Sequence, residues 1–368
     1  MTSPQGFGSR LFMTGAMSFI VTGMISSLNG VALPVFVRDL GVGQSQGNVL
    51  LSLFGLGAML TVLVGIMAAR HLTLRRGLLA IAVGTGLMAL QLNWPLLLVG
   101  GVSTGCGFGA LAVVVNRQFL AGFGDRGPGM VGLVNGIYGL GSILSPLLFV
   151  WVGGGPALVY VAIALLAMLV IPMVQTDQSL AAETPGLPNL RQGPLLILLF
   201  NAIGAVIEVG LIGLGPTALL ANGISGMDVA RLVSAFALAF LLGRLSLYWL
   251  TRHVGSDILF LVALLGTALC TGLTVLGSPA IGFVLSGLFT AMFFPTFYVW
   301  AIGVLKDPRM GSVILCAGLT AVTVAPILLG FILGMVGEDR LFVVLAAVAS
   351  ALALAFVPTL FWARRNRP

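Results

Sequence analysis

The chain has 368 residues, of which 59% are hydrophobic and only 7% are charged, against roughly 25% charged in an average soluble domain. So few charged residues cannot form a water-soluble surface, and the composition excludes a soluble globular protein. The net charge of +7 does not indicate nucleic-acid binding, because the basic residues are scattered at the ends of apolar runs and form no basic stripe.

Apolar runs recur along the whole chain, and each is long enough to cross a hydrocarbon core of roughly 30 Å as a helix. The first set lies near residues 10–35, 47–69, 76–92, 95–121, 129–152 and 155–174. The second set lies near residues 194–221, 227–250, 257–276, 279–304, 310–336 and 339–362. These runs predict an all-α integral membrane protein of about twelve transmembrane helices.

The longest polar stretch, residues 175–193, separates the two sets of runs and contains two prolines and a glycine within five residues, as linkers often do. We therefore expect three parts: an N-terminal six-helix bundle over residues 1–174, a cytoplasmic linker over residues 175–193, and a C-terminal six-helix bundle over residues 194–368.

The two halves share short sequence matches at one fixed offset. Arg70-His71 recurs as Arg252-His253, and Gly84-Thr85 recurs as Gly266-Thr267, each time in equivalent elements. With an even number of spans in each half, the halves run in the same direction across the membrane. The prediction is a pair of parallel six-helix repeats.

The basic residues predict the orientation in the membrane. On one side of the predicted spans lie Arg10, Arg70, Arg75, Arg76, Arg126, Arg191, Arg252, Lys306, Arg309, Arg364, Arg365 and Arg367. Only Arg38, Arg231 and Arg340 fall on the other side. Positive charge favours the cytoplasm, so both termini are predicted to be cytoplasmic. Together with the short loops, this predicts a multi-pass protein of the inner (plasma) membrane.

Polar side chains follow one helical face in four of the predicted spans. They are Thr14, Ser18, Thr22, Ser26 and Asn29 in the first, Asn135, Tyr138, Ser142 and Ser145 in the fifth, Asn201 and Glu208 in the seventh, and Ser312, Cys316, Thr320 and Thr323 in the eleventh. Polar groups in hydrocarbon must be satisfied, so these faces predict a polar path, with the blander third, sixth, ninth and twelfth spans facing lipid. Hydroxyls that bond their own helix or join helices would give the same pattern.

Of the ten acidic residues, only Glu208 is placed near mid-membrane. Arg117 and Arg244 are more than roughly 10 Å nearer the cytoplasmic side by helix rise, so we expect no cation to pair with it. Hydrocarbon favours the neutral form of a carboxyl group, and such groups usually face a pathway. Glu208 is therefore predicted to carry a proton. The alternative is a permanently protonated structural residue bonded to a neighbour such as Asn201.

The remaining candidates are groups that could bind a solute. Asn116 and Asn135 could hydrogen-bond a polyol or join helices. Tyr298 and Trp300 could stack on the apolar face of a sugar or pack within the protein. The sequence shows no Ser/His/Asp arrangement, metal cluster or phosphate loop, so we expect neither catalytic residues nor a metal or cofactor.

Gly65, Arg70, Arg75 and Arg76 resemble the loop signature between spans 2 and 3 of major-facilitator transporters, with Ala69 in place of the usual acidic residue. Further segments are similar to the fucose-galactose-glucose:proton symporter family. They are Ser27 to Pro34, Asn116, Gly139 to Pro146, Glu208, Gly243-Arg244 and Phe294 to Thr296.

This resemblance implies the major-facilitator fold and alternating access to a site between the two bundles. It implies a small, neutral, sugar-like solute bound between Asn29, Asn135, Tyr138, Asn201 and Glu208, with proton coupling at Glu208. Two acidic positions of the family are Gly30 and Ala112 here, which leaves Glu208 alone to couple transport or makes the protein a uniporter. The expected partners are a small-molecule solute, protons and the lipid bilayer, with no nucleic acid, and we expect a monomer.

Other functions stay open at this stage. A proton-driven exporter of lipophilic compounds would suit a cavity so poor in charge. A membrane-embedded enzyme or a non-transporting sensor is also compatible with the composition, although an enzyme would need convergent catalytic groups that the sequence does not show.

Overall fold

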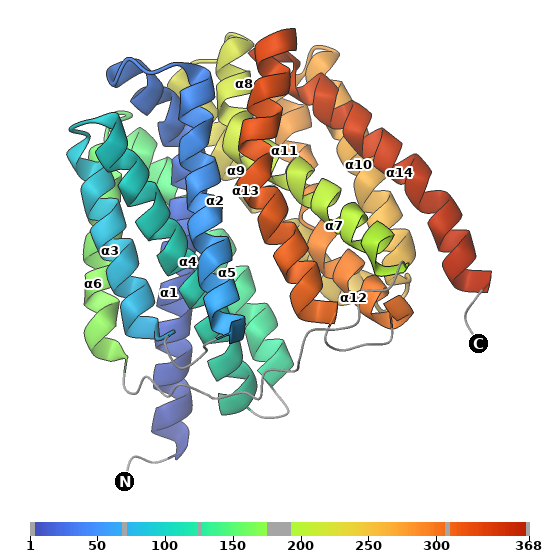
Figure 1. The fold of residues 1–368 in the computed structure, drawn as a ribbon, viewed down its shortest axis with the longest axis horizontal. Coiled ribbons are helices and arrows are strands. Elements are labelled where there is room, and N and C mark those ends of the chain that lie inside the picture. Colours follow the sequence, from blue (N-terminus) through green and yellow to red (C-terminus); the bar gives the residue numbers. More distant parts are fainter. Residues whose placement is uncertain (1–3, 68–71, 124–126, 175–192, 306–309, 366–368) are drawn as a thin grey trace. The chain divides into compact units, whose positions relative to one another are not determined.

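The computed structural model describes residues 4–67, 72–123, 127–174, 193–305 and 310–365. These residues form helices joined by short turns (Figure 1). The chain divides into two compact units, Met1–Thr184 and Pro185–Pro368, and the boundary falls in the stretch predicted to be a linker. Residues 175–192 of that stretch lie outside the described residues.

Unit 1 contains six helices and one short 3-10 turn. They are α1 (Pro4–Asp39), α2 (Gln44–Met67), α3 (Leu74–Leu90), α4 (Trp94–Gly122), α5 (Gly127–Trp151), α6 (Pro156–Val170) and η3 (Ile171–Met173). Side chains of Thr73 and Asn93 accept backbone hydrogen bonds at the starts of α3 and α4, which satisfies donors that a helix start leaves free. Sequence signals of this kind explain why the predicted spans and the observed helices agree closely.

Unit 2 contains the helices of the second half. They are α7 (Gly193–Val209), the π-helical segment η4 (Gly210–Leu214), α8 (Gly215–Ala221), α9 (Gly226–Leu250), α10 (Ser256–Val275), α11 (Pro279–Thr290), α12 (Phe293–Leu305), α13 (Met310–Val336), the 3-10 turn η5 (Glu338–Arg340) and α14 (Leu341–Arg365).

Two of the predicted spans are interrupted in unit 2. The span near 194–221 is divided into α7 and α8 by η4, and the span near 279–304 is divided into α11 and α12. Pro216 follows the first interruption and Pro295 the second. Proline has no N–H to donate one turn back, and its ring crowds the preceding turn. Both predicted spans are confirmed as membrane-length segments, Leu195–Ala221 and Pro279–Leu305, and each contains an irregular turn that the sequence analysis did not predict.

The two units repeat one packing scheme. In unit 1, α1 packs on α5, α2 on α4, and α3 on both α4 and α6. In unit 2, α7 packs on α13, α9 on α11, and α10 on both α11 and α14. When α7 with α8 and α11 with α12 are counted as one span each, the two schemes are the same. This confirms the predicted all-α fold with two similar six-helix halves.

Glycine allows the closest of these contacts. A Cβ atom at Gly23 of α1 would overlap the carbonyl oxygen of Tyr138, and one at Gly141 of α5 would overlap the carbonyl oxygen of Ile20. In α9, a Cβ at Gly243 would overlap the carbonyl oxygen of Leu288 in α11. Small residues at such crossings let helix backbones approach where burial from water contributes little.

The helices have the length and surface of membrane spans. Among the described residues, 11 helices or helix pairs are long and apolar enough to cross a bilayer, while α3, the remaining predicted span, has 17 residues. Large apolar side chains stand exposed at helical spacing on α6 and α10, for example Leu158, Val161 and Leu165, and Val262, Leu265 and Leu269. Exposure of this kind is expected where helices face lipid.

Candidate functional site

Glu208 lies one residue before the end of α7, directly ahead of the π-helical segment Gly210–Leu214. A π-helical turn changes the direction of the following side chains and is frequent at functional sites. The Glu208 side chain is partly buried. The acidic group predicted at mid-membrane therefore sits at an irregular point of its span.

The Glu208 carboxylate makes no hydrogen bond and no ion pair within 4.0 Å with any other described residue. The predicted alternative partner, Asn201, is engaged elsewhere, since its Nδ2 donates to the carbonyl oxygen of Ile314 in α13 over 2.7 Å. Arg244 lies close enough to interact electrostatically with Glu208. No cation forms an ion pair with Glu208 among the described residues, as expected, but the electrostatic influence of Arg244 was not anticipated.

Arg244 lies on α9 and is itself partly buried. Its Cζ lies 5.0 Å from the centroid of the Phe240 ring, one turn earlier on the same helix. Its Nε is buried and has no hydrogen-bond partner. Glu208 and Arg244 are thus two charged side chains in spans of unit 2 that are near each other without forming an ion pair.

Unit 1 brings together three of the predicted solute-binding residues. The Nδ2 of Asn135 in α5 donates to the Oδ1 of Asn116 in α4 over 3.3 Å, and also to the carbonyl oxygen of Val131. One turn further along α5, Tyr138 meets Phe108 of α4 edge-to-face, with 6.5 Å between the ring centroids. All four side chains are partly exposed. The cluster combines amides with aromatic rings.

Asn29 and Asn201 are buried and already bonded. The hydroxyl of Tyr160 in α6 donates to the Oδ1 of Asn29 over 2.7 Å, and both side chains are almost fully buried. Asn201 holds α7 to α13, as described above. In this structure both asparagines join helices, the role that was the alternative to solute binding.

Trp300 and Tyr298 occupy different environments on α12. Trp300 is 5% exposed and packs against Phe297 and Phe356, with ring centroids 5.4 and 4.9 Å away. These contacts place it in the aromatic core of unit 2, and we leave it out of the solute site. Tyr298 is partly exposed and lies against Phe294 with 5.6 Å between centroids.

The hydroxyl groups of the first span bond their own helix. Thr14 donates to the carbonyl oxygen of Arg10 over 3.0 Å, Ser18 to that of Thr14 over 2.7 Å, and Thr22 to that of Phe19 over 2.9 Å. All three are buried. These bonds match the alternative given for the polar face of the first span, in which hydroxyls bond their own helix. They do not support a polar path along that span.

Arginines bond backbone carbonyls near the predicted loop signature between α2 and α3. Arg117 of α4 donates to the carbonyl oxygen of Gly65 at the end of α2 over 3.0 Å. Arg75 of α3 donates to that of Val174 after α6 over 2.7 Å. The backbone N–H of Arg76 donates to the Thr73 cap, and Arg70 lies outside the described residues. These bonds do not need the acidic side chain that Ala69 replaces.

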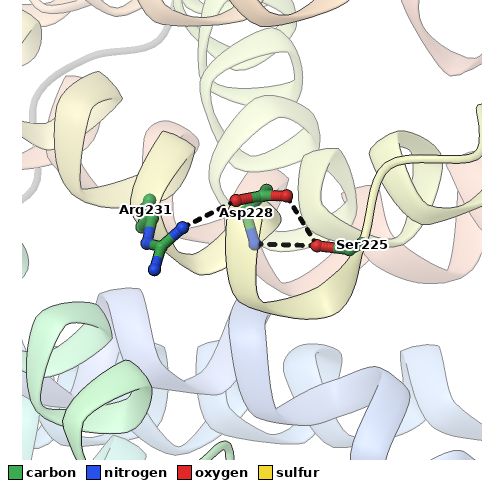
Figure 2. A network of polar contacts seen from close by, with 3 residues as sticks. All are labelled: Ser225, Asp228 and Arg231. Atoms are coloured by element: carbon green, nitrogen blue, oxygen red, sulfur yellow. Dashed lines mark hydrogen bonds and ion pairs between the residues drawn. The ribbon is translucent and has the colours of Figure 1, made fainter.

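The basic residues predicted to face outward all lie beside aspartates. Arg38 pairs with Asp39 at 2.7 Å, Arg231 with Asp228 at 2.9 Å, and Arg340 with Asp339 at 3.4 Å. Figure 2 shows the second pair at the start of α9, where Ser225 also bonds Asp228.

Sequence reasoning missed Tyr160 and the approach of Arg244 to Glu208. The sequence contained a signal for Tyr160, because it is one of only four tyrosines and lies in a span with almost no other polar residue. A lone hydroxyl there must bond something. The sequence contained no signal for the approach of Arg244 to Glu208, because that approach depends on helix tilt. Across the described residues, no group of three or more His, Cys, Asp or Glu side chains could hold a metal ion.

Comparison with solved structures finds the same fold in several transporters. One is a POT family transporter in complex with a thioalcohol-conjugated peptide, at 14% identity and a TM-score of 0.75, covering 99% of this chain and 97% of that one. Another is the nucleoside transporter NupG, at 15% identity and a TM-score of 0.71, covering 95% and 98%. A third is the E. coli fucose:proton symporter FucP, at 16% identity and a TM-score of 0.65, covering 97% and 98%.

A comparison with the sequences of curated proteins gives no match. The family model of the Major Facilitator Superfamily matches residues 15–314. That match spans well over half of the chain and includes helices of both units. With its two similar six-helix halves and its membrane-length helices, the chain belongs to the Major Facilitator Superfamily of transporters.

Proposed function

We propose that the protein is a secondary active transporter that moves a small polar solute together with protons by alternating access. The observation that carries this proposal is Glu208, a carboxyl group in a membrane span without a hydrogen bond or ion pair to another described residue. A group of this kind can be ionised when it faces water and neutral when it is enclosed. The adjoining π-helical segment offers a place where α7 can adjust.

For the solute we propose contacts with Asn116, Asn135 and Tyr138, which lie together in unit 1 and are partly exposed. Within unit 2, Tyr298 is a separate candidate for packing against a solute. Amides and aromatic rings suit a polyhydroxy compound, because hydroxyl groups bond amides and the apolar face of a sugar ring packs on an aromatic ring. The sugar symport of one structural relative supports the same class.

The test is transport by the purified protein in proteoliposomes. Wild-type protein is offered a panel of labelled sugars, polyols, sugar acids and nucleosides, with and without an inward proton gradient. We expect saturable uptake of at least one solute and accumulation above the external concentration only with the gradient. Equal flux with and without the gradient would make the protein a uniporter. No flux across the panel, with drug sensitivity in cells lacking the protein, would favour the exporter of lipophilic compounds.

A further inference from the structure

Arg244 carries a hydrogen-bond donor that the described protein leaves unused. Its Nε is buried and without a partner, and no ion pair holds its guanidinium. A guanidinium that only extended toward the membrane surface would keep Nε in water. Buried donors of charged groups are normally bonded, so the Nε of Arg244 is an exception among the described residues that a bound solute could satisfy.

The packing of α9 holds Arg244 in place. The preceding residue, Gly243, lies so close to the carbonyl oxygen of Leu288 that α9 cannot rotate about its axis without opening the contact with α11. The ring of Phe240 lies below the guanidinium, 5.0 Å from Cζ, and is fixed in turn by Phe236, 6.2 Å away between centroids. The cation is therefore pre-organised, with one face on an aromatic ring and an edge free to bind.

Among the described residues, Glu208 is the acidic group on which Arg244 acts electrostatically, and the two make no ion pair. The described parts of the helices packed against α7 and α9 bring few other titratable groups, namely Tyr298 on α12 and Cys316 on α13, with Arg364 and Arg365 at the far end of α14. Arg244 and ionised Glu208 together carry no net charge.

We infer that Arg244 is the anion-binding group of this transporter and that its solute is a monoanion, a hydroxylated carboxylic acid of the sugar-acid kind. The Nε and one Nη of a guanidinium form a fork that matches a carboxylate. The hydroxyl groups of such a solute are those of the polyhydroxy class proposed above. The inference rests on the proposed function and narrows its solute class.

The summed charge of Arg244, Glu208 and the solute explains why the proposed solute carries one negative charge. When the site is empty, ionised Glu208 offsets Arg244. When a monoanion binds to Arg244, the site keeps the same net charge only if Glu208 takes up one proton. Solute and proton would then enter together, since binding of each favours binding of the other. A phosphate dianion would leave one uncompensated negative charge in the span.

The experiment compares labelled gluconate with glucose, which has the same carbon chain without the carboxylate, and with inorganic phosphate. Wild-type protein is reconstituted into phosphatidylcholine vesicles, so that no anionic lipid headgroup can occupy the site. The variants are Arg244→Gln and Arg244→Lys. The matched control is Arg252→Gln, just beyond the end of the same helix, where the arginine is exposed and lies over Tyr248. Thermal unfolding in detergent verifies that each variant folds.

We expect wild-type protein and Arg252→Gln to exchange gluconate in preference to glucose and phosphate. Arg244→Gln should weaken gluconate exchange roughly tenfold or more, the loss expected for a hydrogen bond to a charged group. Arg244→Lys keeps the charge without the fork and should give an intermediate loss. If Arg244→Gln does not fold, the intermediate loss in Arg244→Lys carries the test.

Two results would overturn the inference. If the protein exchanges glucose but not gluconate, the solute is neutral. The proposed transporter function would then remain intact. Unchanged gluconate exchange in Arg244→Gln or Arg244→Lys would show that the guanidinium does not bind the solute. Absence of flux for gluconate, glucose and the whole solute panel would remove the proposed function as well.

Discussion

The two units share a packing scheme but differ in the contacts that their arginines make. In unit 1, Arg117 and Arg75 donate to backbone carbonyls and so join neighbouring elements. In unit 2, Glu208 and Arg244 lie near each other without an ion pair. The spans of unit 2 are also interrupted twice, whereas α1 and α5 of unit 1 remain single helices despite Pro34 and Pro146. The arginines of unit 1 therefore join neighbouring elements, whereas Glu208 and Arg244 of unit 2 are the charged groups on which the proposed transport depends.

The largest effect on stability is expected at the glycine contact between α1 and α5 of unit 1. Gly141→Ala would force a methyl group onto the carbonyl oxygen of Ile20, and neither backbone can yield without separating α1 from α5. We expect a loss of about 3 kcal/mol or more in the free energy of unfolding, or no folded protein after purification. Gly136→Ala on the same helix is the control, because its Cβ would meet nothing within 4 Å. Equal thermal stability of the two variants would contradict the close packing.

Tyr160→Phe tests whether Asn29 joins helices or binds solute. Removal of the hydroxyl leaves the buried Oδ1 of Asn29 without its hydrogen-bond donor, which should cost about 1–3 kcal/mol of stability. Thermal unfolding should shift downward while the apparent affinity for solute stays the same. Tyr248→Phe, at an exposed tyrosine, should change neither quantity. A change in affinity with unaltered stability would return Asn29 to the solute site.

The amide pair tests recognition by unit 1. Asn116→Ala and Asn135→Ala should each raise the apparent KM for the transported solute several-fold and at most about tenfold, the range of one or two neutral hydrogen bonds. Because the side chains bond each other, the double variant should lose less than the product of the single effects. Asn222→Ala, in the turn after α8, serves as the control. Unchanged KM in both single variants would mean that the pair only joins α4 to α5.

The paired charges at the start of α9 should show the smallest effect. Arg231→Ala removes an exposed ion pair with Asp228, and no measurable change in thermal unfolding or transport is expected. Ser225→Ala removes the helix cap drawn in Figure 2 and should cost about 1 kcal/mol of stability. A loss of transport in Arg231→Ala would show that charge on this face matters as much as charge within the spans.

Much of the fold could be predicted from sequence, because length and apolarity determine membrane helices almost directly. The interruptions at 210–214 and 291–292 were missed since Pro216 and Pro295 lie in apolar runs, where proline is tolerated in membrane helices. For the site, the distribution of acidic residues along the sequence predicted that Glu208 lies within a membrane span, apart from the other acidic residues. Its approach to Arg244 and the bonding of Asn29 by Tyr160 depend on helix tilt and rotation, which periodicity does not determine.

Glu208→Gln tests most directly whether Glu208 couples solute movement to protons. Two rates are compared in proteoliposomes: accumulation driven by an inward proton gradient, and exchange of labelled for unlabelled solute without a gradient. Glu338→Gln, at a partly exposed glutamate just before α14, is the control. We expect Glu208→Gln to abolish gradient-driven accumulation and to retain solute exchange, and we expect Glu338→Gln to retain both activities. Gradient-driven accumulation that survives in Glu208→Gln would contradict this expectation.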